Sequence, residues 1–263
     1  MVKNLSIISA FSATSTGASH IKAGKSCQDY SACWASGKTA IAAIADGHGA
    51  DVHFRSDRGA RFAVEASIQC IKEFVLQNNY ALHNTAALLS ALEKSIIAAW
   101  HEKVADDLRG DAIDGDVFSP YGTTLLVAAI TEHYWFAVQI GDGKCVAFNT
   151  DNRISQPVPW DERCFLCRTT SLCDEEAVSL FRHFYSETLP LAVFLGSDGI
   201  DDSFPVKDNE EHLARFYREV HKNFVKEGLQ KGKTQLREML PLLTQKGSGD
   251  DVSIAGIIRN INP

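Results

Sequence analysis

Three apolar runs separated by very short turns constrain the fold more than any other feature of the sequence. The runs occupy residues 123–130, 134–140 and 144–148, and the turns are Thr131-Glu132-His133 and Gly141-Asp142-Gly143. Turns of this length connect antiparallel strands, because a parallel crossover needs a dozen or more residues. The pattern therefore predicts an antiparallel meander and disfavours a doubly wound parallel sheet.

Further strands and helices are expected on both sides of this meander. Short apolar runs predict strands at residues 5–11, 29–34, 41–45, 191–195 and 252–258. Apolar residues at helical spacing predict helices at residues 57–76, 85–104, 174–186, 208–226 and 233–244. Runs of strands combined with paired helices are typical of an α+β domain in which sheets pack together under helices.

Composition limits the domain organisation and the partners. The chain has 263 residues, 45% of them apolar, and no Pro/Gly/Ser-rich linker or repeat, so we expect one domain over residues 1–263. A net charge of -7 argues against broad nucleic-acid binding, which needs basic side chains. The chain shows no membrane-spanning apolar run and no secretory signal pattern. We expect a cytoplasmic protein that acts as a monomer, without membrane or nucleic-acid partners.

Two local patterns suggest other metals only weakly. The seven cysteines are scattered and odd in number, as expected for reduced thiols in a cytosolic protein. Cys164 and Cys167 have the spacing of a zinc knuckle, but no second pair accompanies them. The acidic segment 106–120 misses the spacing of a calcium-binding EF-hand loop, so a solvated loop is the favoured interpretation.

Aspartates recur where predicted strands meet turns. Asp29 begins a strand, Asp46 and Asp198 end strands just before glycine, and Asp250-Asp251 precede the last strand. Strand ends of packed sheets lie close together, so these carboxylates can converge. Several carboxylates in one pocket repel one another unless divalent cations lie among them, and oxygen ligands favour hard ions such as Mg²⁺ or Mn²⁺. The pattern predicts a two-metal hydrolase.

His48 adds a proton carrier to this prediction. In a two-metal site the ions lower the pKa of a bridging water and neutralise charge on a phosphoryl group. His48 lies two residues after Asp46, where it could protonate the leaving alcohol. The alternative is a histidine that only caps a turn.

Six short motifs occur in a fixed order along nearly the whole chain. They are Gln28-Asp29, Asp46-Gly47-His48-Gly49, Tyr121-Gly122-Thr123-Thr124, Gly141-Asp142-Gly143-Lys144, Ser197-Asp198-Gly199 and Asp250-Asp251-Val252-Ser253. In this order they resemble the motifs of the metal-dependent protein phosphatases of type 2C, in a divergent prokaryote-type branch. The resemblance implies a four-layer sandwich, in which two central antiparallel β-sheets are flanked by pairs of α-helices.

The resemblance also implies a binuclear Mn²⁺ or Mg²⁺ centre that a third ion can join. The implied direct ligands are Asp46, which would bridge both ions, the Gly47 carbonyl, Asp198 and Asp250. Asp29 would act largely through water, and Asp142 matches an acid that can help hold the third ion. Asp251 would lie next to the direct ligands without binding an ion itself.

The implied activity is hydrolysis of phosphoserine and phosphothreonine in proteins by direct attack of a metal-bridging hydroxide, with no phosphoenzyme. One departure concerns the substrate phosphate, because the arginine that eukaryotic members carry five residues before the early acid is Gly24 here. Lys25, Lys22 and His20 lie on the same loop and could bind the phosphate; alternatively, the lysines are only solvated. Two other functions stay open: a regulatory module without turnover, and a hydrolase of small phosphate esters.

Overall fold

Two five-stranded antiparallel sheets form the centre of the protein. The computed structural model describes residues 8–259 except 79, 81, 112, 114, 152, 166 and 167. One sheet has the order β1-β10-β9-β6-β7 and the other the order β2-β3-β4-β5-β8. The strands are β1 (Ile8–Ser15), β2 (Asp29–Ser36), β3 (Thr39–Asp46), β4 (Leu125–Ile130), β5 (Trp135–Ile140), β6 (Lys144–Phe148), β7 (Ile154–Ser155), β8 (Arg182–Ser186), β9 (Ala192–Gly196) and β10 (Val252–Arg259).

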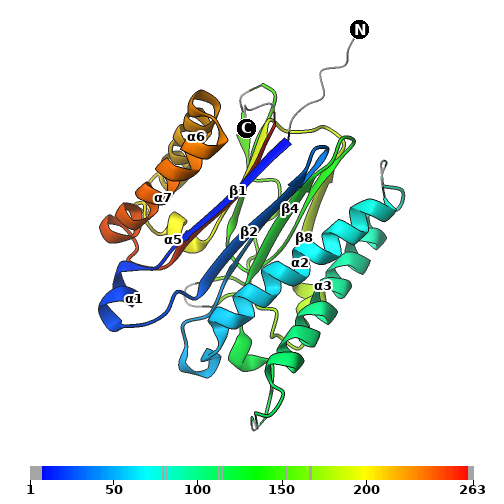
Figure 1. The fold of residues 1–263 in the computed structure, drawn as a ribbon, viewed down its shortest axis with the longest axis vertical. Helices are drawn as coiled ribbons and strands as arrows, with labels where there is room; N and C mark the ends of the chain where they lie inside the picture. Colours follow the sequence, from blue (N-terminus) through cyan, green and yellow to red (C-terminus); the bar gives the residue numbers. More distant parts are fainter. Residues whose placement is uncertain are drawn as a thin grey trace.

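A pair of long helices covers the outer face of each sheet (Figure 1). The helices α2 (Ser56–Gln77) and α3 (Thr85–Asp107) cover the sheet that contains β2, and α6 (Asn209–Glu227) and α7 (Leu229–Lys246) cover the other. The short helices are α1 (Ala18–Ala23), α4 (Ala177–Leu180) and α5 (Asp198–Asp201), with 3-10 turns η1 (Asp51–His53) and η2 (Ser119–Tyr121). The four-layer α+β sandwich implied by the motifs is confirmed.

Three apolar layers hold the sandwich together. The layer between the two sheets contains small side chains such as Ala42, Ala128 and Ala137, all fully buried. The outer layers contain larger side chains, including Trp100 of α3 and Phe224 of α6. Because β3 and β4 are buried on both faces, their sequences read as continuous apolar runs rather than as alternating ones.

The turn at Gly141-Asp142-Gly143 connects the two sheets. The predicted meander is right for β4 and β5, which pair with each other, but wrong for β6, which pairs with β9 and β7 in the other sheet. Gly141 has φ +101°, and a Cβ on Gly143 would lie 2.9 Å from the Gly196 carbonyl oxygen. Glycine permits both the backbone conformation and the close approach, so the chain crosses here and carries Asp142 with it.

The short helix predicted near residues 174–186 is present only at Ala177–Leu180 and is wrong for the residues that follow. The segment contains only the four-residue α4 and then the edge strand β8. Successive β8 side chains face opposite sides: Phe184 packs on Trp135 with ring centroids 4.8 Å apart, and Tyr185 packs on Tyr134 at 5.7 Å. This two-residue period is that of a strand.

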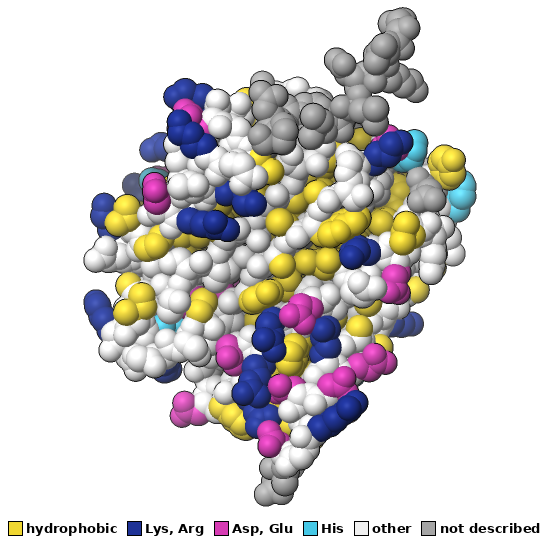
Figure 2. All heavy atoms as spheres, viewed as in Figure 1, with side chains coloured by type: hydrophobic (Ala, Val, Ile, Leu, Met, Phe, Trp, Pro, Cys, Tyr) yellow, Lys and Arg dark blue, Asp and Glu magenta, His cyan; other side chains and the backbone are white. Residues whose placement is uncertain are grey.

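The N-terminal segment differs from its prediction at both ends. The strand predicted at 5–11 continues to Ser15, and its residues 5–7 lie outside the described residues. The loop expected to hold His20, Lys22 and Lys25 contains α1. Figure 2 shows a band of hydrophobic side chains along β1 and β2, which are edge strands of the two sheets and are linked by a 2.7 Å hydrogen bond between the Thr14 and Ser31 hydroxyls. None of the described helices has both the length and the apolar character needed to cross a bilayer.

Candidate metal centre

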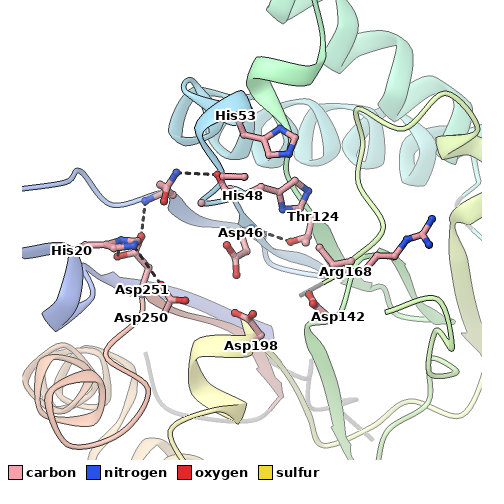
Figure 3. A pocket seen from close by; sticks show the side chains of 15 residues that line it. His20, Asp46, His48, His53, Thr124, Asp142, Arg168, Asp198, Asp250 and Asp251 are labelled. Carbon is pink, nitrogen blue, oxygen red and sulfur yellow. Dashed lines mark hydrogen bonds and ion pairs between the residues drawn. The ribbon is translucent and has the colours of Figure 1, made fainter. Parts of the chain in front are cut away.

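Four strand ends meet at one end of the sandwich and bring the predicted aspartates together. Asp29 and Asp46 are direct register partners, because β2 begins where its neighbour β3 ends. Asp198 follows β9, and Asp250 lies just before β10, the strand paired with β9. Figure 3 shows Asp46, Asp198 and Asp250, with Asp142, around one pocket. The cavity has a volume of about 390 Å³.

The backbone of Asp46 is held by the two threonines of the Tyr121–Thr124 motif. The Asp46 carbonyl accepts hydrogen bonds from the Thr123 hydroxyl and the Thr124 amide, both at 2.9 Å. The Asp46 amide donates to the Thr124 hydroxyl at 3.0 Å. Next to it, Gly47 is so enclosed that a Cβ would lie 2.7 Å from the Ser56 carbonyl oxygen. These contacts fix the strand end that presents the Asp46 carboxylate.

The carboxylates form a cluster with an unbalanced negative charge. Burial, followed by repulsion from Asp198, raises the pKa of Asp29 and of Asp46 well above the usual value. Burial raises the pKa of Asp198 to about 6. Ser197 donates to Asp29 Oδ2 at 2.9 Å, but the buried oxygens Asp29 Oδ1 and Asp198 Oδ1 have no hydrogen-bond partner among the described residues. An oxygen-only donor set of this kind fits divalent ions such as Mg²⁺ or Mn²⁺.

Asp250 and Asp251 have different environments. The Asp250 side chain is 57% exposed at the edge of the pocket, whereas Asp251 is 3% exposed. Asp251 Oδ1 accepts from the Gly17 amide and Oδ2 from the Gln28 amide, both at 2.6 Å. His20 lies beside both acids, with Nδ1 3.1 Å from Asp251 Oδ1. Asp251 thus fastens the N-terminal segment to the site, whereas Asp250 is the exposed acid of the two.

Replacing Asp251 with Asn should destabilise the metal-free protein by about 2 kcal/mol, because the new amide group cannot accept one of the two backbone N–H bonds. Urea unfolding with chelator present measures this change. Asp250→Asn is the matched control, since its exposed carboxyl holds no such pair of amides. Equal stability of the two variants would contradict the role assigned to Asp251.

The turn that carries Asp142 is fixed by side chains from the segment after β7. The Gly141 amide donates to the Thr170 hydroxyl at 2.9 Å, and the Arg182 guanidinium donates to the Gly141 carbonyl. Lys144 lies 3.7 Å from Asp201 Oδ2 and 4.4 Å from the centre of the Trp160 ring. Lys144 is therefore a structural partner of α5 and of the segment that contains Trp160.

His48 lines the pocket beside a second histidine. Its amide donates to the Gly122 carbonyl at 3.1 Å, and its ring lies 4.9 Å from that of His53. Burial, with a smaller effect of His53, lowers the pKa of His48 to about 4. The imidazole is therefore neutral at pH 7, and the role of His48 as proton donor stays a prediction.

The predicted phosphate-binding residues are only partly brought to the pocket. His20 lines it, whereas Lys22 and Lys25 are exposed on and after α1 and are not among the described lining residues. Sequence reasoning missed three other polar lining residues, His53, Arg168 and Thr169. Arg168 and Thr169 come from an irregular segment with no periodic pattern, so only the tertiary structure identifies them.

The two alternative metal sites gain no support. Cys164 is buried with its sulfur 3.4 Å from the Thr169 hydroxyl oxygen, and Cys167 lies outside the described residues. In the acidic segment, Asp111 pairs with Arg55 at 2.6 Å, which is a structural role, and Asp114 lies outside the described residues.

Comparison with solved structures identifies the fold. The catalytic domain of the serine/threonine protein phosphatase PstP, in complex with two manganese ions, is 15% identical with a TM-score of 0.61, over 97% of this chain and 99% of that one. PppA, a regulatory component of T6SS in Pseudomonas aeruginosa, is 14% identical with a TM-score of 0.61, over 97% and 99%. The phosphatase domain of SpoIIE from Bacillus subtilis is 13% identical with a TM-score of 0.53, over 98% and 95%.

Comparison of the sequence itself gives the family. No curated protein matches the chain. The family model described as "Protein phosphatase 2C" matches residues 16–241, which include five of the six motifs and all the predicted site residues except Asp250. The chain belongs to the protein phosphatase 2C family.

Proposed function

We propose that the protein is a Mn²⁺- or Mg²⁺-dependent phosphatase that hydrolyses phosphoserine and phosphothreonine in proteins. The observation that carries this proposal is the meeting of Asp29, Asp46 and Asp198, with two buried carboxylate oxygens that have no partner among the described residues. When bound, two such ions would activate a water and neutralise charge on the phosphoryl group. PstP, which has the same fold, was crystallised with two manganese ions.

The position of each residue in the pocket determines its proposed role. Asp46, the Gly47 carbonyl, Asp198 and Asp250 are the proposed direct ligands, with Asp29 acting through water and Asp142 available to a third ion. Thr123 and Thr124 orient Asp46, and Asp251 holds the N-terminal segment in place. His48, neutral at pH 7, is proposed to donate an N–H hydrogen bond to the oxygen of the leaving alcohol.

Exposed apolar side chains near the pocket favour a protein substrate over a small phosphate ester. Val52 and Phe54 are 54% and 63% exposed and flank His53, and Phe165 is 72% exposed and pairs with Arg168. Large apolar side chains exposed together often mark a surface that contacts another protein.

A regulatory module without turnover is the second candidate function, favoured only by the glycine at position 24.

The test of the proposal measures activity and metal binding separately. Purified protein with millimolar Mn²⁺ should release phosphate from phosphopeptides, and excess chelator should abolish the release. Activity on small esters but on no phosphopeptide would support the small-ester hydrolase. Binding of Mn²⁺ without turnover on any substrate would support the regulatory module.

Mn²⁺ should also raise the melting temperature, because the ions relieve repulsion among the carboxylates. At about 100 times its dissociation constant, a bound ion contributes about 2.7 kcal/mol of stability. For a domain of this size this corresponds to roughly 5 to 10 °C. Differential scanning calorimetry with and without chelator measures the shift, and no shift at millimolar Mn²⁺ would contradict a metal centre.

A further inference from the structure

A phosphate group that enters this pocket meets an excess of negative charge. Five aspartates line the cavity: Asp46, Asp142, Asp198, Asp250 and Asp251. Two divalent ions neutralise four charges, and a phosphate monoester adds close to two negative charges at neutral pH. A cationic side chain is therefore needed to bind the phosphate, and Gly24 cannot provide one.

Arg168 is the one lysine or arginine among the described residues that line the pocket. The nearby cations are engaged elsewhere. Lys144 pairs with Asp201, and Arg163 and Arg182 lie 2.7 Å and 3.6 Å from the Asp161 carboxylate. No ion pair involves Arg168 within the part of the chain that the structure describes.

The residues that follow Arg168 are tied to the turn that carries Asp142 and to Thr123, whose hydroxyl binds the Asp46 carbonyl. Phe165 and Arg168 exchange two backbone hydrogen bonds of 2.9 and 3.1 Å as an antiparallel bridge. Two residues later, the Thr170 hydroxyl accepts from the amide of Gly141, next to Asp142, and Ser171 exchanges hydrogen bonds with the backbone of Thr123. The position of the Arg168 Cα is thus fixed relative to the acids, while its side chain stays exposed.

We propose that Arg168 binds the substrate phosphate, as the replacement for the arginine absent at position 24. This inference rests on the proposed function for the identity of the ligand. In Figure 3 the guanidinium points outward, beyond Asp142, so it must turn toward the carboxylates when a phosphate arrives. Exposed side chains change rotamer within nanoseconds, and a guanidinium binds phosphate through two parallel N–H bonds.

Binding of inorganic phosphate to the Mn²⁺-loaded full chain tests the proposal by calorimetry. Arg168→Ala should weaken phosphate binding roughly 10- to 100-fold, because charge-assisted hydrogen bonds are lost. Arg168→Lys should fall between, since an ammonium keeps the charge without the fork. Arg153→Ala, which removes an exposed arginine on the β6–β7 turn, is the control and should change nothing. Melting temperatures and Mn²⁺ affinities of all variants should match those of the wild type.

Kinetics add a second measurement. For an aryl phosphate, Arg168→Ala should raise KM by the same factor and change kcat less. Unchanged phosphate affinity in Arg168→Ala, or no phosphate binding by the wild type, would overturn the inference. Loss of phosphate affinity in the double variant Lys22→Ala/Lys25→Ala, with Arg168→Ala unaffected, would also overturn it. If the wild type binds phosphate through Arg168 but hydrolyses no ester, the proposed function fails and the assignment of Arg168 stands.

Discussion

Replacing Asp46 with Asn should lower phosphatase activity about a thousandfold and raise the melting temperature of the metal-free protein. The carboxylate is the proposed bridge between two ions, and loss of an interaction worth ~4 kcal/mol in the transition state corresponds to about three orders of magnitude in rate. The opposite effect on stability follows because the Asp46 carboxylate is buried among acids that repel it; burial first, and then repulsion from Asp198, raises its pKa. Asn keeps the shape and removes that charge.

The two effects are measured separately for this variant. Phosphate release with Mn²⁺ gives the activity, and calorimetry with chelator gives the melting temperature. Asp106→Asn, which changes an acid 67% exposed at the end of α3, is the control for a general loss of charge. Activity within tenfold of the wild type would exclude Asp46 as a metal bridge. A lower metal-free melting temperature would exclude strong repulsion within the cluster.

The convergence of the aspartates could be predicted from the sequence, whereas one connection between strands could not. Asp29, Asp46 and Asp198 could be found because each stands at the boundary of an apolar run, and antiparallel pairing brings such boundaries together. The sheet to which β6 belongs could not be found, because a three-residue turn between apolar runs looks the same within one sheet or between two. Only the close packing of Gly143 on Gly196 distinguishes the cases.

The short strand β8 shows a second limit. Residues 182–186 alternate between two faces, but five residues give too little periodicity to outweigh a preceding stretch that reads as helix. Their conformation depends on pairing with β5, which is far away in sequence.

The phosphate-binding side of the pocket shows the same limit in chemical terms. The lysines predicted for it, Lys22 and Lys25, lie close to Asp29 in sequence. Arg168 lies in a segment without regular structure, more than a hundred residues after Asp29 and Asp46. Its position depends on side-chain hydrogen bonds from Thr170 and Ser171, which no periodic pattern encodes.

The glycine of Ser197-Asp198-Gly199 provides the second large expected effect, this time on stability. A Cβ at Gly199 would lie 2.0 Å from the Asp251 carbonyl oxygen and 3.2 Å from Val252 Cγ1. The Asp251 carbonyl belongs to buried backbone and cannot move aside as the end of a flexible side chain can. Gly199→Ala must therefore separate α5 from the start of β10. Overpacking of this severity costs on the order of 3 kcal/mol, or roughly 6 to 12 °C in melting temperature.

Gly49→Ala is the matched control for Gly199→Ala, because a Cβ there meets only Gln28 Oε1, at 3.7 Å, and the φ angle is not positive. Calorimetry of both variants with chelator compares their stabilities without any contribution from metal ions. Because α5 carries Asp198 and β10 follows Asp250, Gly199→Ala should also weaken Mn²⁺ binding, measured as a smaller rise in melting temperature with added Mn²⁺. A melting temperature no lower than that of Gly49→Ala would show that α5 moves freely against β10.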